Sequence, residues 1–357
     1  MNELLKNIKP ERPEPILLKH KPYSVNKKTD RKKVAEKLLS GSYALVEDKF
    51  PTGLAVLAEL KKTLFGKKSK EDFKAYREKR TEYHHASNNL LVPIRNNKIA
   101  LPKAPETGWL EKLYPDVSDF YLSFPQVQGL NSAWQWYIRG IKYPGLKKKI
   151  HPWYGTYFPT RYDHLKSFDK WLKSYTGRKS TAIDMGTGCG VLAFQLLNRG
   201  FEKVIAADIN PNAVISVMEN AEKLGLTGRL DVRQSDLFEH FEEKADLIVF
   251  NPPWLPAQQD VSGLDSAIYY EPGLFERFFD QAGSYLNEGG ILILLFSNLA
   301  RSAGVRDTHP VEEELEKNNR FRKVRLIKRK VSKPSRKTKR RDHRKDEYVE
   351  LWELALI

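Results

Sequence analysis

The chain passes from an apolar run into a glycine-rich turn at Thr181-Ala182-Ile183-Asp184-Met185-Gly186-Thr187-Gly188-Cys189-Gly190. Further on lies a second apolar run, Leu247-Ile248-Val249-Phe250. It ends in a polar turn that two prolines stiffen, Asn251-Pro252-Pro253-Trp254, called the elbow below. Between the two, the apolar run 204–207 stops at Asp208. Each polar group follows the end of an expected strand, and ligand sites of open α/β sheets lie at such strand ends. The stretch from Thr181 to Trp254 therefore predicts both the fold and a ligand site.

Apolar runs and helical patterns alternate from about residue 150 onward. The runs lie at 181–183, 204–207, 247–250 and 291–296, and the helical patterns lie at 162–175, 191–197, 211–224 and 274–286. Such alternation is typical of a parallel sheet with helices on both faces. Residues 321–331 and 348–356 indicate a closing pair of strands. We therefore predict an α/β domain over residues 151–357.

The first 150 residues follow a different pattern. Residues 1–30 are rich in proline and lysine and predict an arm. Residues 31–150 predict a mainly helical domain, because apolar residues recur there at three- and four-residue intervals in two segments, 31–39 and 51–64. Residues 91–101 predict a small hairpin around Asn96-Asn97.

Residues 105–160 are rich in aromatic side chains, with Lys147–Lys149 among them. Such a cluster forms either a packed joint between two domains or a platform on which bases stack. We favour the joint, because aromatic side chains dominate burial in cores and interfaces.

Composition restricts the compartment and the partner. The 357 residues carry one cysteine, which excludes an internal disulfide framework and predicts a reducing compartment and no metal site. The start of the chain has no apolar segment of the signal-peptide kind, and the apolar run 291–296 is too short to cross a membrane. We expect a cytoplasmic protein. The formal charge of +16 includes a basic loop at 328–345 and predicts a polyanionic partner.

The glycine turn and the carboxylates after it favour one nucleotide-like ligand. Val191 stands where the G-x-G-x-x-G pattern of hydride-transfer enzymes needs its third glycine. Asp184 would repel a pyrophosphate but suits the ammonium of a methionine tail. Asp208 can accept hydrogen bonds from a ribose diol, and Asp236 can accept from an adenine amino group while Leu237 packs against the ring. These residues predict S-adenosylmethionine rather than a dinucleotide.

The elbow predicts the acceptor of the methyl group. The side-chain oxygen of Asn251 and the carbonyl of Pro252 can accept both hydrogens of one amino group, which holds its nitrogen in line for attack. Two prolines, Pro252 and Pro253, fix the backbone, and Trp254 offers a flat face for stacking. We therefore predict Asn251, Pro252, Pro253 and Trp254 as the catalytic residues of methyl transfer to a planar nitrogen.

At these residues the chain resembles the class I S-adenosylmethionine-dependent methyltransferases. Its NPPW motif, Asn251 to Trp254, is similar to the (N/D)PP(Y/F/W) signature of their amino-group methylating branch. Two further segments, 156–163 and 269–272, resemble parts of the release-factor glutamine methyltransferases. The resemblance implies a Rossmann-like seven-stranded sheet with S-adenosyl-L-methionine as cofactor. It implies a cofactor site made of Asp184, Gly186, Thr187, Gly188, Gly190, Asp208, Ile209, Asp236, Leu237 and Asn251.

The resemblance has two departures and leaves the acceptor open. Trp254 replaces the usual tyrosine, and the first 150 residues do not match the small helical bundle of the release-factor enzymes. We expect an N-methyltransferase acting on an exocyclic amino group of a nucleic-acid base, RNA before DNA, through the loop 328–345. A protein glutamine amide is the alternative, because the same two acceptors would hold it equally well. A binding module with a vestigial core is disfavoured, since no cofactor position is missing, and a small-molecule methylase would not need the basic loop. No pattern addresses the oligomeric state.

Overall fold

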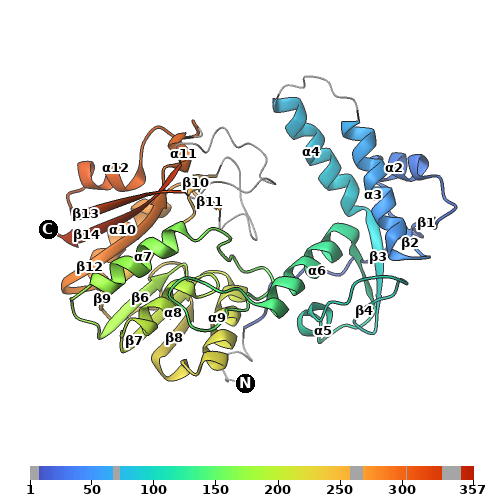
Figure 1. Cartoon of the computed structure of the whole chain (residues 1–357). Helices are drawn as coiled ribbons and strands as arrows, with labels where there is room; N and C mark the ends of the chain where they lie inside the picture. The colour runs from blue at the N-terminus through green and yellow to red at the C-terminus, as the bar shows by residue number, and fades with distance from the viewer. Residues whose placement is uncertain (1–7, 67–72, 258–267, 303, 332–346) are drawn as a thin grey trace. The chain divides into compact units, whose positions relative to one another are not determined.

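Two units make up the chain. The structure, a computed structural model, describes residues 8–66, 73–257, 268–302, 304–331 and 347–357 (Figure 1). One unit is Arg12–Ile138, and the other is Arg139–Ile357 together with the segment up to Glu11. Most of the predicted basic loop, residues 332–345, lies outside the described residues.

Every run predicted as a strand after residue 180 lies in one sheet, which has seven strands within the described residues. In chain order they are β6 (Thr181–Met185), β7 (Lys203–Asp208), β8 (Leu230–Gln234), β9 (Ala245–Phe250), β12 (Leu286–Ser297), β13 (Phe321–Lys330) and β14 (Tyr348–Leu356). Their order in the sheet is β13-β14-β12-β9-β6-β7-β8. β14 runs in the direction opposite to the other six strands, and those six strands all end at the same edge of the sheet. The predicted seven-stranded α/β sheet is confirmed.

Helices cover both faces of this sheet, as Figure 1 shows. They are α7 (Asp163–Ser174), α8 (Val191–Asn198), α9 (Pro211–Leu224), α10 (Leu274–Ala282), α11 (Leu299–Ser302) and α12 (Pro310–Lys317), with short 3-10 turns at Thr227–Arg229 and Gly283–Tyr285. Successive strand residues point to opposite faces. Ala182 packs with residues of α7, α8 and α9, whereas its neighbour Ile183 packs with α10 and α12. The near-continuous apolar runs of the sequence therefore reflect burial on both sides.

The first unit combines helices with a sheet. Its helices are α2 (Arg31–Leu39), α3 (Phe50–Phe65), α4 (Phe73–Asn88), α5 (Trp109–Leu113) and α6 (Phe124–Arg139). Its described strands are β1 (Tyr23–Val25), β2 (Ala44–Val46), β3 (Leu90–Arg95), β4 (Lys98–Ile99) and β5 (Phe120–Ser123). The predicted hairpin is confirmed as β3 and β4, with Asn96 and Asn97 at φ 49° and 55° in the turn. The rest of the sheet was not predicted, because strands of three or four residues carry too little periodicity.

The domain boundaries differ from those expected at 30/31 and 150/151. Ile16 bridges to Tyr121 and β1 follows, so residues after Glu11 belong to the first unit rather than to a separate arm. Ile141 and Ile150 pair with each other and are buried in the core of the second unit. The division therefore lies at 138/139, twelve residues before the predicted position.

The aromatic-rich segment contributes to both cores. Trp109 packs edge-on against Trp134 and beside Tyr137 in the first unit. Tyr143 is 2% exposed and meets Tyr162 edge-on in the second unit. The expectation that this segment forms a joint between the units stays a prediction. Among the helices that the structure describes, none has the length and apolar character to cross a membrane.

The turn from β6 into α8 depends on glycine. Gly186, Gly188 and Gly190 all have positive φ. At Gly190, φ is 84°, and a Cβ atom would lie 2.7 Å from the ring of Phe194 and 3.1 Å from Val217. A side chain here would be both strained and overpacked.

Gly190→Ala is expected to lower the free energy of unfolding by about 2–4 kcal/mol, from the positive φ together with the clash. Urea denaturation measures this. Gly228→Ala is the matched control, because no atom lies within 4 Å of its added methyl group. We expect the control to change stability by less than about 0.5 kcal/mol. Equal free energies of unfolding for the two variants would contradict the requirement for glycine at position 190.

Candidate active site

A cavity of about 260 Å³ opens at the carboxyl ends of β6, β7 and β9. Met185, Asp208 and Phe250, the last residues of these strands, line it. The predicted site residues that line it are Gly186, Thr187, Gly188, Asp208, Ile209, Asp236, Leu237, Asn251 and Pro253. Four predicted residues do not line it: Asp184, Gly190, Pro252 and Trp254. Predicted residues from four separate parts of the chain, 186–188, 208–209, 236–237 and 251–253, thus meet at one place.

Asp184 lies beneath the glycine turn, fully buried. Its Oδ2 accepts hydrogen bonds from Thr187 Oγ1 at 2.7 Å and from the backbone N–H of Ala193 at 2.9 Å. Its Oδ1 has no partner among the described residues. Burial raises the pKa of Asp184 to about 7, while its two hydrogen bonds act in the opposite direction. A cation close to Oδ1 would restore the ionised form.

Asp208 holds the glycine turn against the end of β7. Its Oδ2 accepts from the N–H of Gly188 at 2.8 Å, and its Oδ1 accepts from the N–H of Asn210 at 2.9 Å. Burial raises the pKa of this carboxyl. Each carboxylate oxygen retains a lone pair for a further donor. Ile209, 62% exposed, presents an apolar side chain beside it.

Asp236 has a partner that the sequence did not reveal. The guanidinium of Arg277, on α10, lies 2.9 Å from Asp236 Oδ2, and both residues line the cavity. Leu237 adopts a φ of 51° and is 5% exposed. No local motif marks Arg277, because it reaches the cavity from a helix 41 residues away.

Asn251 follows β9 and lines the cavity, and its Oδ1 is buried without a hydrogen-bond partner among the described residues. Pro252 is buried and does not line the cavity. After the elbow, β10 (Leu255–Pro256) pairs with β11 (Tyr269–Tyr270), and Tyr269, Tyr270 and Glu271 also line the cavity. The segment 269–272, singled out in the sequence, therefore lies at the same site.

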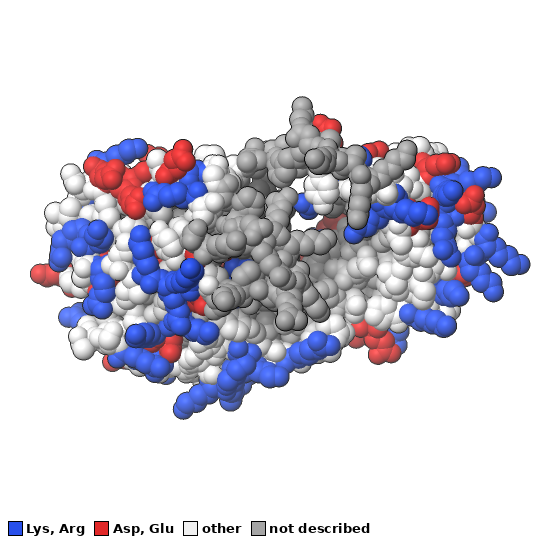
Figure 2. All heavy atoms as spheres, turned by 45° about the horizontal axis from the view of Figure 1, so that its top comes forward, with Lys and Arg blue, Asp and Glu red and all other residues white. Residues whose placement is uncertain are grey.

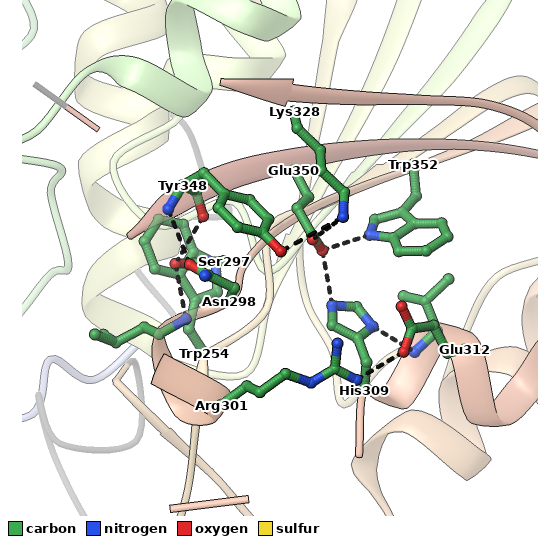
Figure 3. Close-up of polar contacts among 12 residues, drawn as sticks. Trp254, Ser297, Asn298, Arg301, His309, Glu312, Lys328, Tyr348, Glu350 and Trp352 are labelled. Carbon is green, nitrogen blue, oxygen red and sulfur yellow. Dashed lines mark hydrogen bonds and ion pairs between the residues drawn. The ribbon is translucent and has the colours of Figure 1, made fainter. Parts of the chain in front are cut away.

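Trp254 is anchored outside the lining. Its Nε1–H donates to the carbonyl of Leu295 in β12 at 3.3 Å. Figure 3 shows it beside Ser297 and Asn298 at the end of that strand. Its ring meets the ring of His164 edge to face, with centroids 5.5 Å apart. The expected role of Trp254 as a flat face for stacking stays a prediction. The indole is held by backbone and ring contacts, and His164, which the sequence did not single out, lines the cavity instead.

Cys189 is no nucleophile. Its side chain is 2% exposed, and burial raises the pKa of the thiol to about 12. A neutral, buried thiol in this position packs at the glycine turn.

Comparisons with known proteins agree with this geometry. The family model described as "Methyltransferase small domain" matches residues 169–325. A putative protein N5-glutamine methyltransferase of Methanocaldococcus jannaschii is 32% identical over 167 residues, which cover 44% of this chain and 80% of the relative. A release factor glutamine methyltransferase of Cereibacter sphaeroides is 34% identical over 127 residues, covering 32% of this chain and 46% of the relative.

A relative that acts on RNA matches a shorter region. The tRNA1(Val) (adenine(37)-N6)-methyltransferase of Actinobacillus pleuropneumoniae is 39% identical over 79 residues, which cover 21% of this chain and 34% of the relative. The chain thus spans less than half the length of two of these three relatives. The region that matches the family model, 169–325, contains the glycine turn, Asp184, Asp208, Asp236 and the elbow. The chain belongs to the S-adenosylmethionine-dependent methyltransferases of the methyltransferase small domain family.

Proposed function

We propose that this enzyme transfers the methyl group of S-adenosylmethionine to a planar amino nitrogen at the elbow. One observation carries the proposal: the buried, unpaired Oδ1 of Asn251 at the end of β9, in the wall of the cavity. A buried acceptor without a donor costs about 1–3 kcal/mol, and an incoming N–H group would offset that cost.

The residues at the other end of the cavity fit the cofactor. Asp184 does not line the cavity, but its unpaired Oδ1, beneath the glycine turn, would provide negative charge for the ammonium of the methionine part. Asp208 supplies acceptors for ribose hydroxyls, and Asp236 supplies one for the adenine amino group. Ile209 and Leu237 give apolar contact for the base. The cofactor supplies an activated methyl group on a sulfonium.

At the elbow, this chain positions the nucleophile. Asn251 Oδ1 and the Pro252 carbonyl accept the two hydrogens of the acceptor nitrogen and stabilise the positive charge that develops on it. Pro252 and Pro253 restrict the backbone, so these acceptors are held in place before the acceptor binds. The reaction forms a nitrogen–carbon bond, breaks the carbon–sulfur bond and leaves the electron pair on sulfur.

We propose that the acceptor is an exocyclic amino group of a nucleic-acid base, most simply in RNA. The edge strand β13 supports this. Its exposed basic residues are Arg322, Lys323, Arg325, Lys328, Arg329 and Lys330. Arg325 and Lys328 have carboxylate partners in β14, whereas the other four have none among the described residues. Figure 2 shows further Lys and Arg side chains over the surface, with Asp and Glu between them.

The direction of β13 brings its basic end to the edge of the sheet at which the cavity opens. β13 and β12 are both antiparallel to β14, so β13 runs parallel to β12 and β9. Its last residue, Lys330, pairs with Tyr348, next to the residue that pairs with Ser297 at the end of β12. Neighbouring strands lie about 4.8 Å apart, so β13 is three strand spacings, roughly 14 Å, from β9. Phosphates flanking a base held at Asn251 can reach that distance.

A glutamine amide of a protein is the second candidate. It is favoured by the relative that the chain covers to 80% of its length, a putative protein N5-glutamine methyltransferase. An amide NH2 offers Asn251 and Pro252 the same two hydrogens as a base, so the elbow accepts both. For this candidate, β13 would contact an acidic protein or a ribosome.

Asn251→Ala is expected to abolish methyl transfer, with a loss of at least about 100-fold, because it removes an acceptor aimed at developing charge. Calorimetry should show S-adenosylmethionine binding within about threefold of wild type. Asn251→Asp is the matched variant, because it keeps an oxygen acceptor, and we expect it to retain more activity than the alanine variant. Full activity of Asn251→Ala would exclude the elbow as the acceptor site.

Reversing charge at the cavity end of β13, with Arg329→Glu and Lys330→Glu together, should weaken RNA binding. We expect the slope of log affinity against log salt to fall by about 1–2, as phosphate contacts are lost. The control is Arg322→Glu with Lys323→Glu, the same charge change at the opposite end of the strand. If both pairs lower affinity equally, net charge rather than a phosphate-binding edge explains the binding.

A further inference from the structure

His164 lies at the acceptor end of the cavity. It is the second residue of α7, its side chain is 2% exposed, and it lines the cavity together with Asn251 and Pro253. Its ring packs edge-on, at 88°, against Trp254. Because Trp254 is anchored to β12, the imidazole is fixed beside the elbow.

Neither ring nitrogen of His164 has a hydrogen-bond partner among the described residues. Buried polar groups are nearly always paired, so both an N–H donor and a lone pair here need an explanation. Packing alone does not explain a histidine here. An apolar ring such as that of phenylalanine would fill the space without burying unpaired polar atoms.

His309 shows how the same unit treats a structural histidine. It is 5% exposed, and its Nδ1 accepts from the N–H of Val311 at 3.2 Å. Its Nε2 lies 2.9 Å from Glu350 Oε2, a contact seen in Figure 3. His309 therefore has a hydrogen bond at Nδ1 and a carboxylate at ion-pair distance from Nε2, whereas His164 has no hydrogen-bond partner at either nitrogen within the described residues and lines a cavity.

His164 is uncharged at neutral pH. Burial lowers the pKa of its imidazole to about 4, and the nearby carboxylate of Asp163 opposes this shift. One ring nitrogen thus carries a free lone pair and the other an N–H group. Which nitrogen carries the hydrogen depends on the partner that binds.

The proposed transfer needs a proton acceptor. When an amide or exocyclic amino nitrogen forms a bond to the methyl carbon, the electron pair of the carbon–sulfur bond goes to sulfur. The nitrogen is then cationic and acidic, and it must lose one proton. Asn251 and Pro252 accept hydrogen bonds but have no basic atom to take that proton, while Asp184 and Asp208 already bind donors at the glycine turn.

We propose that His164 is a further catalytic residue: its neutral imidazole takes up the proton that the amino nitrogen releases on methylation, while Asn251 and Pro252 position that nitrogen. The imidazolium then returns the proton to solvent when the product leaves. This inference rests on the proposed function, since it assigns a proton path to the same transfer. A weakly basic imidazole suffices, because the methylated cationic nitrogen is a stronger acid than the imidazolium.

The test is single-turnover transfer of labelled methyl from S-adenosylmethionine into total RNA and total protein, offered separately, from pH 6 to 9. Wild type and His164→Phe are compared, because phenylalanine keeps the ring contact with Trp254 and removes the base. We expect His164→Phe to transfer at least about 100-fold more slowly and to speed up about tenfold per pH unit, as hydroxide replaces the lost base. The wild-type rate should be nearly flat over this range. Calorimetry should give the same S-adenosylmethionine affinity for both.

His309→Gln is the matched control at a buried histidine with partners, and we expect its rate and its flat pH profile to equal those of wild type. If His164→Phe does not fold, His164→Ala replaces it, and free imidazole should restore its rate at least about tenfold. Two results would overturn the role of His164 alone, provided that the wild-type enzyme labels RNA or protein. In the first, the folded His164→Phe variant transfers methyl as fast as wild type. In the second, free imidazole does not restore the rate of His164→Ala. A wild-type enzyme that labels neither pool would overturn the proposed function, and the role of His164 with it.

Discussion

The carboxylate of Asp208 connects the two strands on which the cofactor end of the site depends. It accepts from the N–H of Gly188 in the turn after β6, while the N–H of Thr187 donates to the carbonyl of Ala207 at the end of β7. These bonds fix the glycine turn over the strand ends, where a side chain at Gly188 would meet the carbonyl of Tyr157 at 3.0 Å. At Gly186 and Gly188 the cavity wall consists of backbone atoms, so the shape of this part of the wall follows from the conformation of the turn. The cofactor end of the site is therefore built before any ligand arrives.

The acceptor end differs from the cofactor end, because some of its buried polar groups have no hydrogen-bond partner among the described residues. Asn251 Oδ1 and both nitrogens of His164 have no hydrogen-bond partner among the described residues, whereas His309 Nδ1 and Glu350 Oε2 each have one. Folding tolerates this cost where an incoming group can offset it. A donor-rich planar amino group fits both residues, which connects the elbow, the histidine and the chemistry of nitrogen methylation. The ring of Trp254 contacts the imidazole of His164 edge to face.

Much of the fold and part of the site could be predicted from the sequence, for physical reasons that particular residues show. Runs such as 247–250 are apolar on both faces because both faces of the sheet are covered, and the polar residues after them, Asp208 and Asn251, mark the strand ends. His164 and Arg277 escaped prediction because they reach the cavity from helices and follow no local pattern. Strands as short as β1 and β2 carry no readable period, so the sheet of the first unit and the boundary at 138/139 were missed.

The most direct test of the central claim is the fate of labelled methyl from S-adenosylmethionine offered with total RNA, genomic DNA and cell protein in separate reactions. The account predicts label in RNA and, after digestion to nucleosides, recovery of the label on an exocyclic amino nitrogen. Label confined to protein, on a glutamine amide, would reject the nucleic-acid acceptor while keeping the chemistry of the elbow. Label on carbon or on ribose oxygen, or no label in any pool despite tight cofactor binding, would contradict transfer to a planar amino group.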